Sequence, residues 1–202
     1  MRLNPVSRVM ANAYDAAVSP HLWPSALEAV TSHIGAVGAA YIIFNKQSRH
    51  VDWACFTGPS VEMKGDYVRH YAALDPYSPV LTAAPRGSWL ALSNCFPDTV
   101  LRSDEWYNDF VLKSGVCDIV GVSLLDSPTH SIILGVHQEN GQGSFAPARI
   151  AALEQFFEPL SKAAGLHVEL RARGLKSGAA QFAFGALAAG VIATDADGHI
   201  MR

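Results

Sequence analysis

The chain has 202 residues, half of them apolar, and carries a formal net charge of -3 at neutral pH. This apolar content is enough for a folded core and argues against a disordered chain. No run of Lys and Arg provides the positive surface that binding to a phosphate backbone requires, so we expect these residues to make no contact with DNA or RNA themselves.

Two amphipathic helices are predicted before residue 35. Their apolar residues recur three or four positions apart, as one face of a helix requires. These residues are Val6, Met10, Tyr14 and Ala17 in the first helix, and Trp23, Leu27, Val30 and Ile34 in the second. Each helix is expected to lay its apolar face on a sheet.

Two β-hairpins are predicted to form that sheet. The first pairs residues 39–44 with residues 51–57 and ends at Gly58-Pro59, and the second pairs residues 116–125 with residues 131–137. A further short strand is predicted at residues 89–92. The strands are expected to combine into one central antiparallel sheet.

Helical and broken segments separate the two hairpins. A helix is predicted from residue 60 to residue 74, where the Asp75-Pro76 step ends or redirects it. Prolines then prevent any long element before residue 97. Ser103 is expected to cap a helix that carries Trp106 and Phe110 and closes at Gly115.

A long helix is predicted from residue 147 to residue 173, with a kink at Pro159. Its apolar residues alternate three and four apart, which is typical either of a dimer seam or of a face that packs on the chain's own sheet: Ile150, Leu153, Phe157, Leu160, Ala164 and His167. A polar, glycine-marked joint follows near residues 171–178. We expect one self-sufficient domain over residues 1–173. Residues 174–202 are expected to form a linker and the truncated start of a second domain, whose sequence resembles the opening hairpin of a PAS-like domain.

The predicted fold class is α/β in the α+β sense: a central antiparallel sheet with helices packed on its faces, a GAF/PAS-like sandwich, and a long C-terminal helix. The sequence contains none of the phosphate-loop, dinucleotide-binding, zinc-protease or nucleophile-elbow motifs. No two of the eight histidines share an i, i+4 helix face together with a carboxylate. We therefore expect no enzymatic activity, no metal and no cofactor.

The cysteines and the hydropathy pattern bear on the compartment. Cys55, Cys95 and Cys117 are widely spaced and form no C-x-x-C motif, which fits a reducing cytoplasm. A rival hypothesis is a redox function, and fast labelling of Cys95 by a thiol reagent would support it. No window of about 18 uncharged apolar residues could span a bilayer. We expect a cytoplasmic protein with no membrane partner.

Aromatic side chains are frequent in the strands and in the region between the hairpins. Tyr and Trp combine an apolar ring with one hydrogen-bonding group, which suits either a ligand pocket or ordinary core packing. Asp75 follows one of these aromatic stretches and could accept a hydrogen bond from a ligand or cap the next helix. The candidate ligand-binding residues are Tyr41, Trp53, Tyr67, Tyr71, Asp75, Trp89, Trp106 and Phe110.

A family resemblance rests on three features of residues 11–173. The run from Tyr71 to Pro76 is followed by Trp89, and Phe110 precedes Gly115 and a strand at residues 120–124. This combination resembles the N-terminal sensory domains of LuxR-type transcription regulators. The resemblance implies a small-molecule effector and transcriptional regulation, with DNA contacted only by a C-terminal helix-turn-helix domain that this chain does not contain.

The resemblance also implies roles for individual residues. In quorum-sensing members, the Asp before Pro binds the acyl amide of a homoserine lactone and the following Trp lines the pocket, which implies these roles for Asp75 and Trp89. The family's residues for the lactone ring and the acyl carbonyl fall near Glu62 and Gly58, which offer no equivalent donor. The resemblance is therefore to GAF-like or autoinducer-binding-like sensors in general. The alternative is a structural module that forms a homodimer through the seam without a ligand.

Overall fold

The computed structural model describes residues 4–186, with side chains up to residue 174. The α-helices are α1 (Pro5–Val18), α2 (Trp23–Ile34), α3 (Lys64–Arg69), α4 (Tyr77–Ala83), α5 (Leu92–Cys95), α6 (Asp98–Leu101), α7 (Pro147–Ala151) and α8 (Phe157–Ala186). Shorter turns are η1 (Pro20–Leu22), η2 (Gly58–Val61), η3 (Tyr71–Ala73) and η5 (Glu154–Phe156), and η4 (Trp106–Val111) is π-helical.

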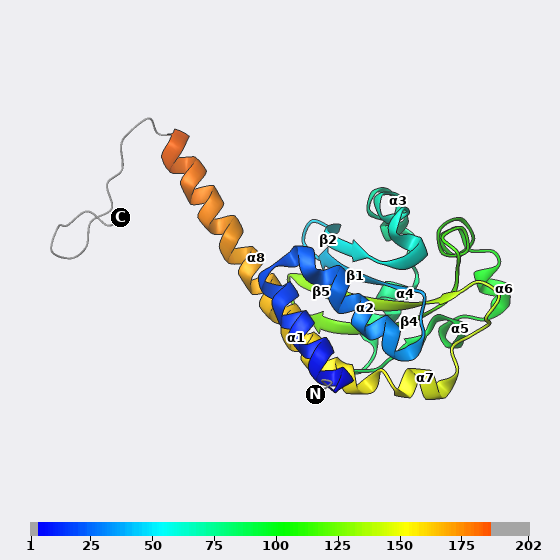
Figure 1. The fold of residues 1–202 in the computed structure, drawn as a ribbon. Coiled ribbons are helices and arrows are strands. Elements are labelled where there is room, and N and C mark those ends of the chain that lie inside the picture. Colours follow the sequence, from blue (N-terminus) through cyan, green and yellow to red (C-terminus); the bar gives the residue numbers. More distant parts are fainter. Residues whose placement is uncertain (1–3, 187–202) are drawn as a thin grey trace, which may run out of the picture. The chain divides into compact units, whose positions relative to one another are not determined.

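The strands form one antiparallel sheet in the order β2-β1-β5-β4-β3 (Figure 1). Their bounds are Gly38–Asn45 for β1, His50–Phe56 for β2, Leu90–Ala91 for β3, Val116–Asp126 for β4 and His130–Glu139 for β5. Both predicted hairpins and the short strand near Trp89 are confirmed. The predicted fold class, a central antiparallel sheet with packed helices and a long C-terminal helix, is confirmed as well.

Successive side chains of a strand point to opposite faces of the sheet, and this alternation separates two layers of the core. On one face, Tyr41 of β1 stacks on Trp23 of α2, with ring centroids 4.0 Å apart. On the other face, Ala40 and Ile42 lie with Tyr77 and other side chains from the segments between the hairpins. The sheet is therefore covered by helices on both faces.

The N-terminal helices agree with the prediction in position but only partly in their buried faces. In α2, all four predicted apolar residues are buried. In α1, the buried residues are Val9, Ala13, Ala16 and Ala17, and the predicted contact residue Met10 is 43% exposed. Of the predicted residues, Ala17 is buried and Val6 and Tyr14 are half-buried, so the predicted face of α1 is only partly correct. The buried face is displaced toward Val9 and the small side chains of Ala13 and Ala16.

The predicted helix at residues 60–74 is wrong as one element, because the segment is divided into η2, α3 and η3. Tyr67 is the only buried residue between Val61 and Leu74. The predicted cap at Ser103 is also displaced, since it is the Asp104 carboxylate that accepts the backbone N–H of Tyr107, at 2.8 Å. Asp104 begins the turn that carries Trp106.

The predicted helix at residues 147–173 is interrupted before Pro159, between α7 and α8. Pro159 is the third residue of α8, where its missing N–H costs no helical hydrogen bond. The predicted joint near residues 171–178 is helical, because α8 continues to Ala186. The predicted PAS-like strand and turn near residues 190–200 lie outside the described residues.

The chain divides into two units, residues 1–167 and residues 168–202. The first contains the whole sheet. In the second, the described part is helical, and Glu169 and Arg173 form an exposed ion pair one turn apart, 3.7 Å between charged atoms. Such exposed pairs contribute little to stability.

Five of the six residues of the heptad-like seam are buried within the first unit, and Ile150 is half-buried. Leu153, Leu160, Ala164 and His167 are fully buried, and Phe157 is 8% exposed. Of the two possibilities that the sequence left open, the structure shows packing within the same chain.

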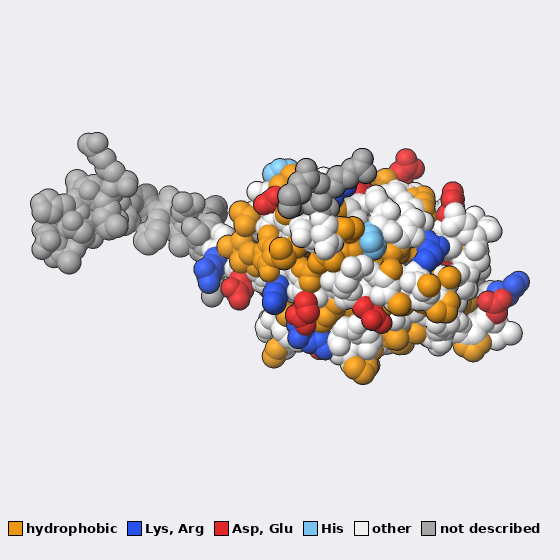
Figure 2. Space-filling view, turned by 60° about the horizontal axis from the view of Figure 1, so that its bottom comes forward, with side chains coloured by type: hydrophobic (Ala, Val, Ile, Leu, Met, Phe, Trp, Pro, Cys, Tyr) orange, Lys and Arg blue, Asp and Glu red, His pale blue; other side chains and the backbone are white. Residues whose placement is uncertain are grey.

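Apolar side chains also reach the surface, and the face drawn in Figure 2 carries apolar patches with charged side chains around them. The most exposed large hydrophobic residues, each at least 39% exposed, are Met10, Val18, Val61, Val68, Leu74 and Val100. Three of them belong to the segment around α3, so this segment buries little apolar surface.

We expect Leu160→Ala to lower the free energy of unfolding by about 2–5 kcal/mol, because it leaves a cavity in a fully buried site. Lys162→Ala, an exposed neighbour on the same helix, should change it by less than about 0.5 kcal/mol. Urea unfolding of both variants tests this. An effect of Leu160→Ala on oligomeric state without loss of stability would contradict burial of the seam within the chain.

Candidate ligand-binding cavity

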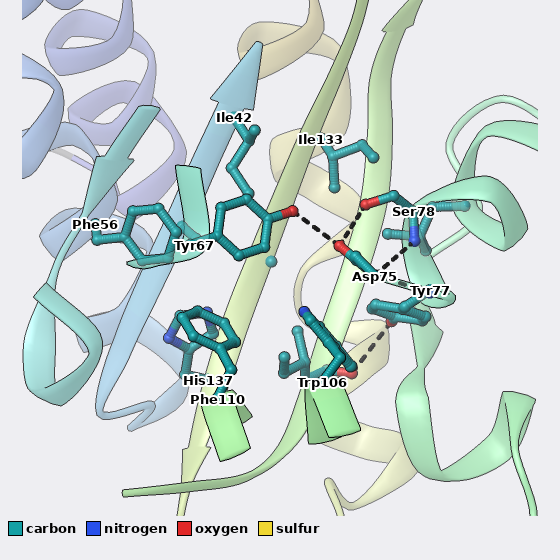
Figure 3. A pocket seen from close by; sticks show the side chains of 14 residues that line it. Ile42, Phe56, Tyr67, Asp75, Tyr77, Ser78, Trp106, Phe110, Ile133 and His137 are labelled. Atoms are coloured by element: carbon teal, nitrogen blue, oxygen red, sulfur yellow. Dashed lines mark hydrogen bonds between the residues drawn. The ribbon is translucent and has the colours of Figure 1, made fainter. Parts of the chain in front are cut away.

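A small cavity lies between the sheet and the segments that connect the two hairpins (Figure 3). The sheet contributes Ala40, Ile42, Phe56, Ile119, Ile133, Gly135 and His137, and the connecting segments contribute Tyr67, Asp75, Tyr77, Ser78, Leu81, Trp106 and Phe110. Its volume is about 40 Å³, room for a few water molecules. Pockets that hold metabolites are typically about 300–1,000 Å³, so a ligand must enlarge this one.

Asp75 is the polar centre of the cavity wall. Its Oδ1 accepts the backbone N–H groups of Tyr77 and Ser78, at 2.8 and 3.1 Å. Its Oδ2 accepts the hydroxyls of Tyr67 and Ser78, at 2.8 and 2.6 Å. The carboxylate therefore caps the start of α4 and also holds the Tyr67 ring, as the dashed lines in Figure 3 show.

Burial sets the ionisation of this pair. The pKa of Asp75 is raised by burial, and the hydrogen bonds from Ser78 and Tyr67 act in the opposite direction because they favour the carboxylate. Burial also raises the pKa of Tyr67 well above its usual value, with the Asp75 charge acting in the same direction. Tyr67 is therefore a neutral donor to Asp75 at physiological pH.

Trp106 provides a donor that the fold does not use. Its indole is 2% exposed and lines the cavity, and Nε1–H has no hydrogen-bond partner among the described residues. In Figure 3 the indole nitrogen faces the space beside Asp75. A buried N–H without a partner costs roughly 1–3 kcal/mol, so a ligand that supplies an acceptor gains from this group.

His137 lines the other end of the cavity. Its Nδ1 lies 3.1 Å from the hydroxyl of buried Ser60, and burial lowers the pKa of the imidazole to about 4. Ser60 is not among the residues that line the cavity. His137 is therefore a neutral polar group in the wall.

The eight residues predicted from the sequence fall into two groups. Tyr67, Asp75, Trp106 and Phe110 line the cavity together. Tyr71 packs beside it, 5.3 Å from the Phe110 ring.

The other three predicted residues, Tyr41, Trp53 and Trp89, do not line this cavity. The rings of Tyr41 and Trp53 lie 5.7 Å apart on the opposite face of the sheet, and both contact the His167 ring. Trp89 is buried one residue before β3, outside the cavity lining.

Sequence reasoning missed Tyr77, Ser78 and His137. Tyr77 and Ser78 directly follow Pro76, so their place at the start of a capped helix was a usable signal. His137 ends a predicted strand and shares its face with Ile133 and Gly135, which strand alternation could have identified.

The two positions where the family resemblance expects lactone-binding side chains do not reach the cavity. At Gly58, a Cβ atom would lie 2.2 Å from the carbonyl oxygen of Val37, so the backbone itself requires glycine. Glu62 is exposed. Neither residue lines the cavity.

A surface groove of about 390 Å³ adjoins the cavity and shares Asp75, Ser78 and Ile133 with it. Its outer part carries the cationic residues Lys46 and Arg49. Lys46 is paired with Asp126 at 2.6 Å. The groove provides a polar approach to an otherwise aromatic site.

Other chemistries find little support in the described part of the chain. Burial raises the pKa of Cys55 to about 11 and also raises the pKa values of Cys95 and Cys117, which disfavours reactive thiolates. No group of His, Cys, Asp and Glu residues within the described range could hold a metal ion. None of the helices formed by the described residues is long and apolar enough to cross a membrane.

We expect Asp75→Ala to lower the free energy of unfolding by about 2–4 kcal/mol, because it removes the α4 cap and leaves buried donors without an acceptor. The matched control is Asp66→Ala, which breaks only an exposed pair with Arg69. Thermal and urea unfolding measure the difference. Equal stability of the two variants would contradict the role of Asp75.

The low pKa of His137 predicts a pH dependence of stability. Between its unfolded value of about 6.5 and its folded value of about 4, only the unfolded chain binds the proton, so stability falls as pH falls, by up to about 3 kcal/mol. His137→Gln should flatten this part of the profile in urea unfolding at a series of pH values. If the stability of His137→Gln and that of the unaltered chain depended on pH in the same way, His137 would not be a buried, neutral side chain.

Comparisons with known proteins place the fold. The sequence matches no protein-family model and no curated protein. The ligand-binding domain of VqsR from Pseudomonas aeruginosa gives a TM-score of 0.60 at 14% identity, over 80% of this chain and 94% of that one. CepR2 from Burkholderia cenocepacia is an N-acylhomoserine lactone dependent LuxR-family transcription factor. It gives a TM-score of 0.59 at 15% sequence identity, over 83% of this chain and 98% of the CepR2 chain. The chain has the fold of these regulator domains.

Proposed function

We propose that residues 1–173 are the small-molecule sensor of a LuxR-type transcription regulator, with the ligand bound in the cavity beside Asp75 and Trp106. The unused indole N–H of Trp106 carries this proposal, because it is a fully desolvated donor aimed at a space lined by aromatic and aliphatic side chains. The likeness in fold to two regulator domains supports it.

The lining favours a neutral ligand. Asp75 is the one formally charged side chain among the fourteen lining residues, and it is already hydrogen-bonded. An anionic ligand would meet this carboxylate without a balancing cation in the wall. The ligand is therefore an apolar or aromatic molecule that carries a hydrogen-bond acceptor for the Trp106 indole. It differs from an acyl-homoserine lactone, because Gly58 and Glu62 offer no contacts to a lactone.

The remaining parts of the proposal concern the whole regulator. The signal would leave through α8, because its buried residues Leu160 and Ala164 pack within the sensor and a ligand can favour one packing of that helix. We place the regulator in the cytoplasm, in keeping with its three free cysteines. DNA contact would come from a helix-turn-helix domain outside these residues. A homodimer could use the exposed Met10 and Val18 of α1.

A thermal-shift screen of neutral metabolites tests the sensor. A ligand should raise Tm with increasing concentration. Trp106→Phe should weaken its binding about three- to tenfold, since it removes one hydrogen bond and keeps an aromatic ring. Trp89→Phe is the matched control, because Trp89 is also buried with an unpartnered indole N–H in the described structure, but lies outside the cavity lining.

Isothermal titration of each hit against the three proteins gives the affinities. A screen without hits, or equal weakening by Trp106→Phe and Trp89→Phe, would contradict a ligand site at Trp106.

A further inference from the structure

Tyr67 fills the space next to the cavity. It is 1% exposed, and its ring packs 5.5 Å from the Phe56 ring and 5.2 Å from the Phe110 ring. Figure 3 shows it between Phe56 and Asp75, with its hydroxyl directed at the carboxylate. With this ring in place, only about 40 Å³ remains empty.

The bond between Tyr67 and Asp75 differs from the other bonds of that carboxylate. The remaining donors belong to Tyr77 and Ser78, within the turn that Asp75 itself begins. Tyr67 comes from a different element, α3. Its phenol is thus held by an aromatic wall and one carboxylate acceptor, the two kinds of contact that a ligand in this site would make.

The segment that carries Tyr67 has no other fully buried side chain: Met63, Tyr71 and Ala72 pack against the core only partly buried, and the bond from His70 to Glu105, 2.8 Å long, is exposed. Within α3, Tyr67 is the only buried residue, while Val68 is 40% exposed, and Val61 and Leu74 on either side are 50% and 39% exposed. Figure 1 shows α3 at the margin of the sheet, beside β2. A segment with few buried apolar contacts opens at low free-energy cost.

We propose that Tyr67 is an intramolecular stand-in for the effector, and that the effector is a small neutral hydroxylated aromatic molecule which displaces it and donates to Asp75 in its place. This inference rests on the proposed sensor function. It adds the class of the ligand and a closed state, in which Tyr67 occupies the position of the ligand. The aromatic wall of Phe56 and Phe110 already accommodates a phenol ring. A second polar atom on the effector accepts from Trp106 Nε1, which the Tyr67 hydroxyl leaves unpaired.

Displacement has two consequences. Departure of the ring adds its own volume to the cavity and brings it toward the size that a metabolite needs. It also lowers the apparent affinity for the effector, because only the fraction of molecules with Tyr67 displaced can bind. The closed state therefore sets a concentration threshold for the response.

The test uses p-cresol, which reproduces the tyrosine side chain, and toluene, which lacks the hydroxyl. Tyr67→Ala in the full 202-residue chain should bind p-cresol at least about tenfold more tightly than toluene, and at least about tenfold more tightly than the unaltered chain does. Addition of Asp75→Asn should reduce the preference for p-cresol over toluene. Isothermal titration and the rise in Tm measure each combination.

Tyr107→Ala is the matched control for a cavity of tyrosine size. Tyr107 is half-buried, and its hydroxyl donates to the Cys117 carbonyl at 2.9 Å rather than to a carboxylate. This variant should show no comparable preference for p-cresol. Tyr67→Phe covers the case in which Tyr67→Ala does not fold: it keeps the ring, removes the bond to Asp75, and should bind p-cresol about three- to tenfold more tightly than the unaltered chain.

Equal affinity of p-cresol and toluene for Tyr67→Ala, or no gain over the unaltered chain in either Tyr67 variant, would overturn the inference. Its failure is distinct from failure of the sensor function. A metabolite that binds the unaltered chain while the Tyr67 hydroxyl stays on Asp75 would retain the sensor and refute displacement. Selective p-cresol binding by Tyr67→Ala, with no metabolite found for the unaltered chain, would support the stand-in and count against the sensor.

Discussion

The Asp75 carboxylate is the interaction on which this site depends. It accepts hydrogen bonds from two backbone N–H groups at the start of α4 and from the hydroxyls of Ser78 and Tyr67. Of the residues that donate to it, Tyr67 and Tyr77 are buried, so their donors would be left without a partner if the carboxylate were lost. The same group thus fixes the position of α4, holds α3 through Tyr67, and forms the polar wall of the cavity. Replacement of the donors that Asp75 accepts would therefore affect the positions of both α3 and α4.

The alternation of side chains along the strands determines which residues line the cavity together with Asp75. Alternation along β1 and β5 directs Ile42, Ile133 and Gly135 toward the cavity, and directs Tyr41 toward the opposite face, where it meets Trp23 and the His167 ring. The rings of Tyr41 and Trp53 therefore lie on the face of the sheet that contacts His167 of α8. The sheet separates the face that lines the candidate cavity from the face on which His167 of α8 packs.

Much of the fold follows from local sequence patterns. Strand alternation and turn residues located both hairpins, and helical spacing located the buried face of α2. The buried face of α1 was predicted only in part, because Met10 and Tyr14 give a stronger apolar signal than Ala13 and Ala16, which are the buried residues. The break before α8 was placed at Pro159 because a proline in the first turn of a helix cannot be distinguished, from sequence alone, from one in its interior.

The candidate site was predictable only in part. Asp75, Tyr67, Trp106 and Phe110 were found from residue type and from their place between the hairpins. Tyr41 and Trp53 have the same residue types, but strand alternation assigns them to the other face, and that assignment needs the register of the whole sheet. The bond between Tyr67 and Asp75 joins two elements across a broken helical segment, so no periodicity could reveal it.

The central claim is that a ligand takes the place of the Tyr67 ring beside Phe56, Phe110 and Asp75. The most direct measurement is nuclear Overhauser spectroscopy on the unaltered chain saturated with p-cresol. The account predicts contacts from the p-cresol ring to the Trp106 indole N–H and the Ile133 methyl groups, together with loss of the contacts between the Tyr67 and Phe110 rings. Contacts confined to exposed residues, with the Tyr67–Phe110 contacts preserved, would contradict it.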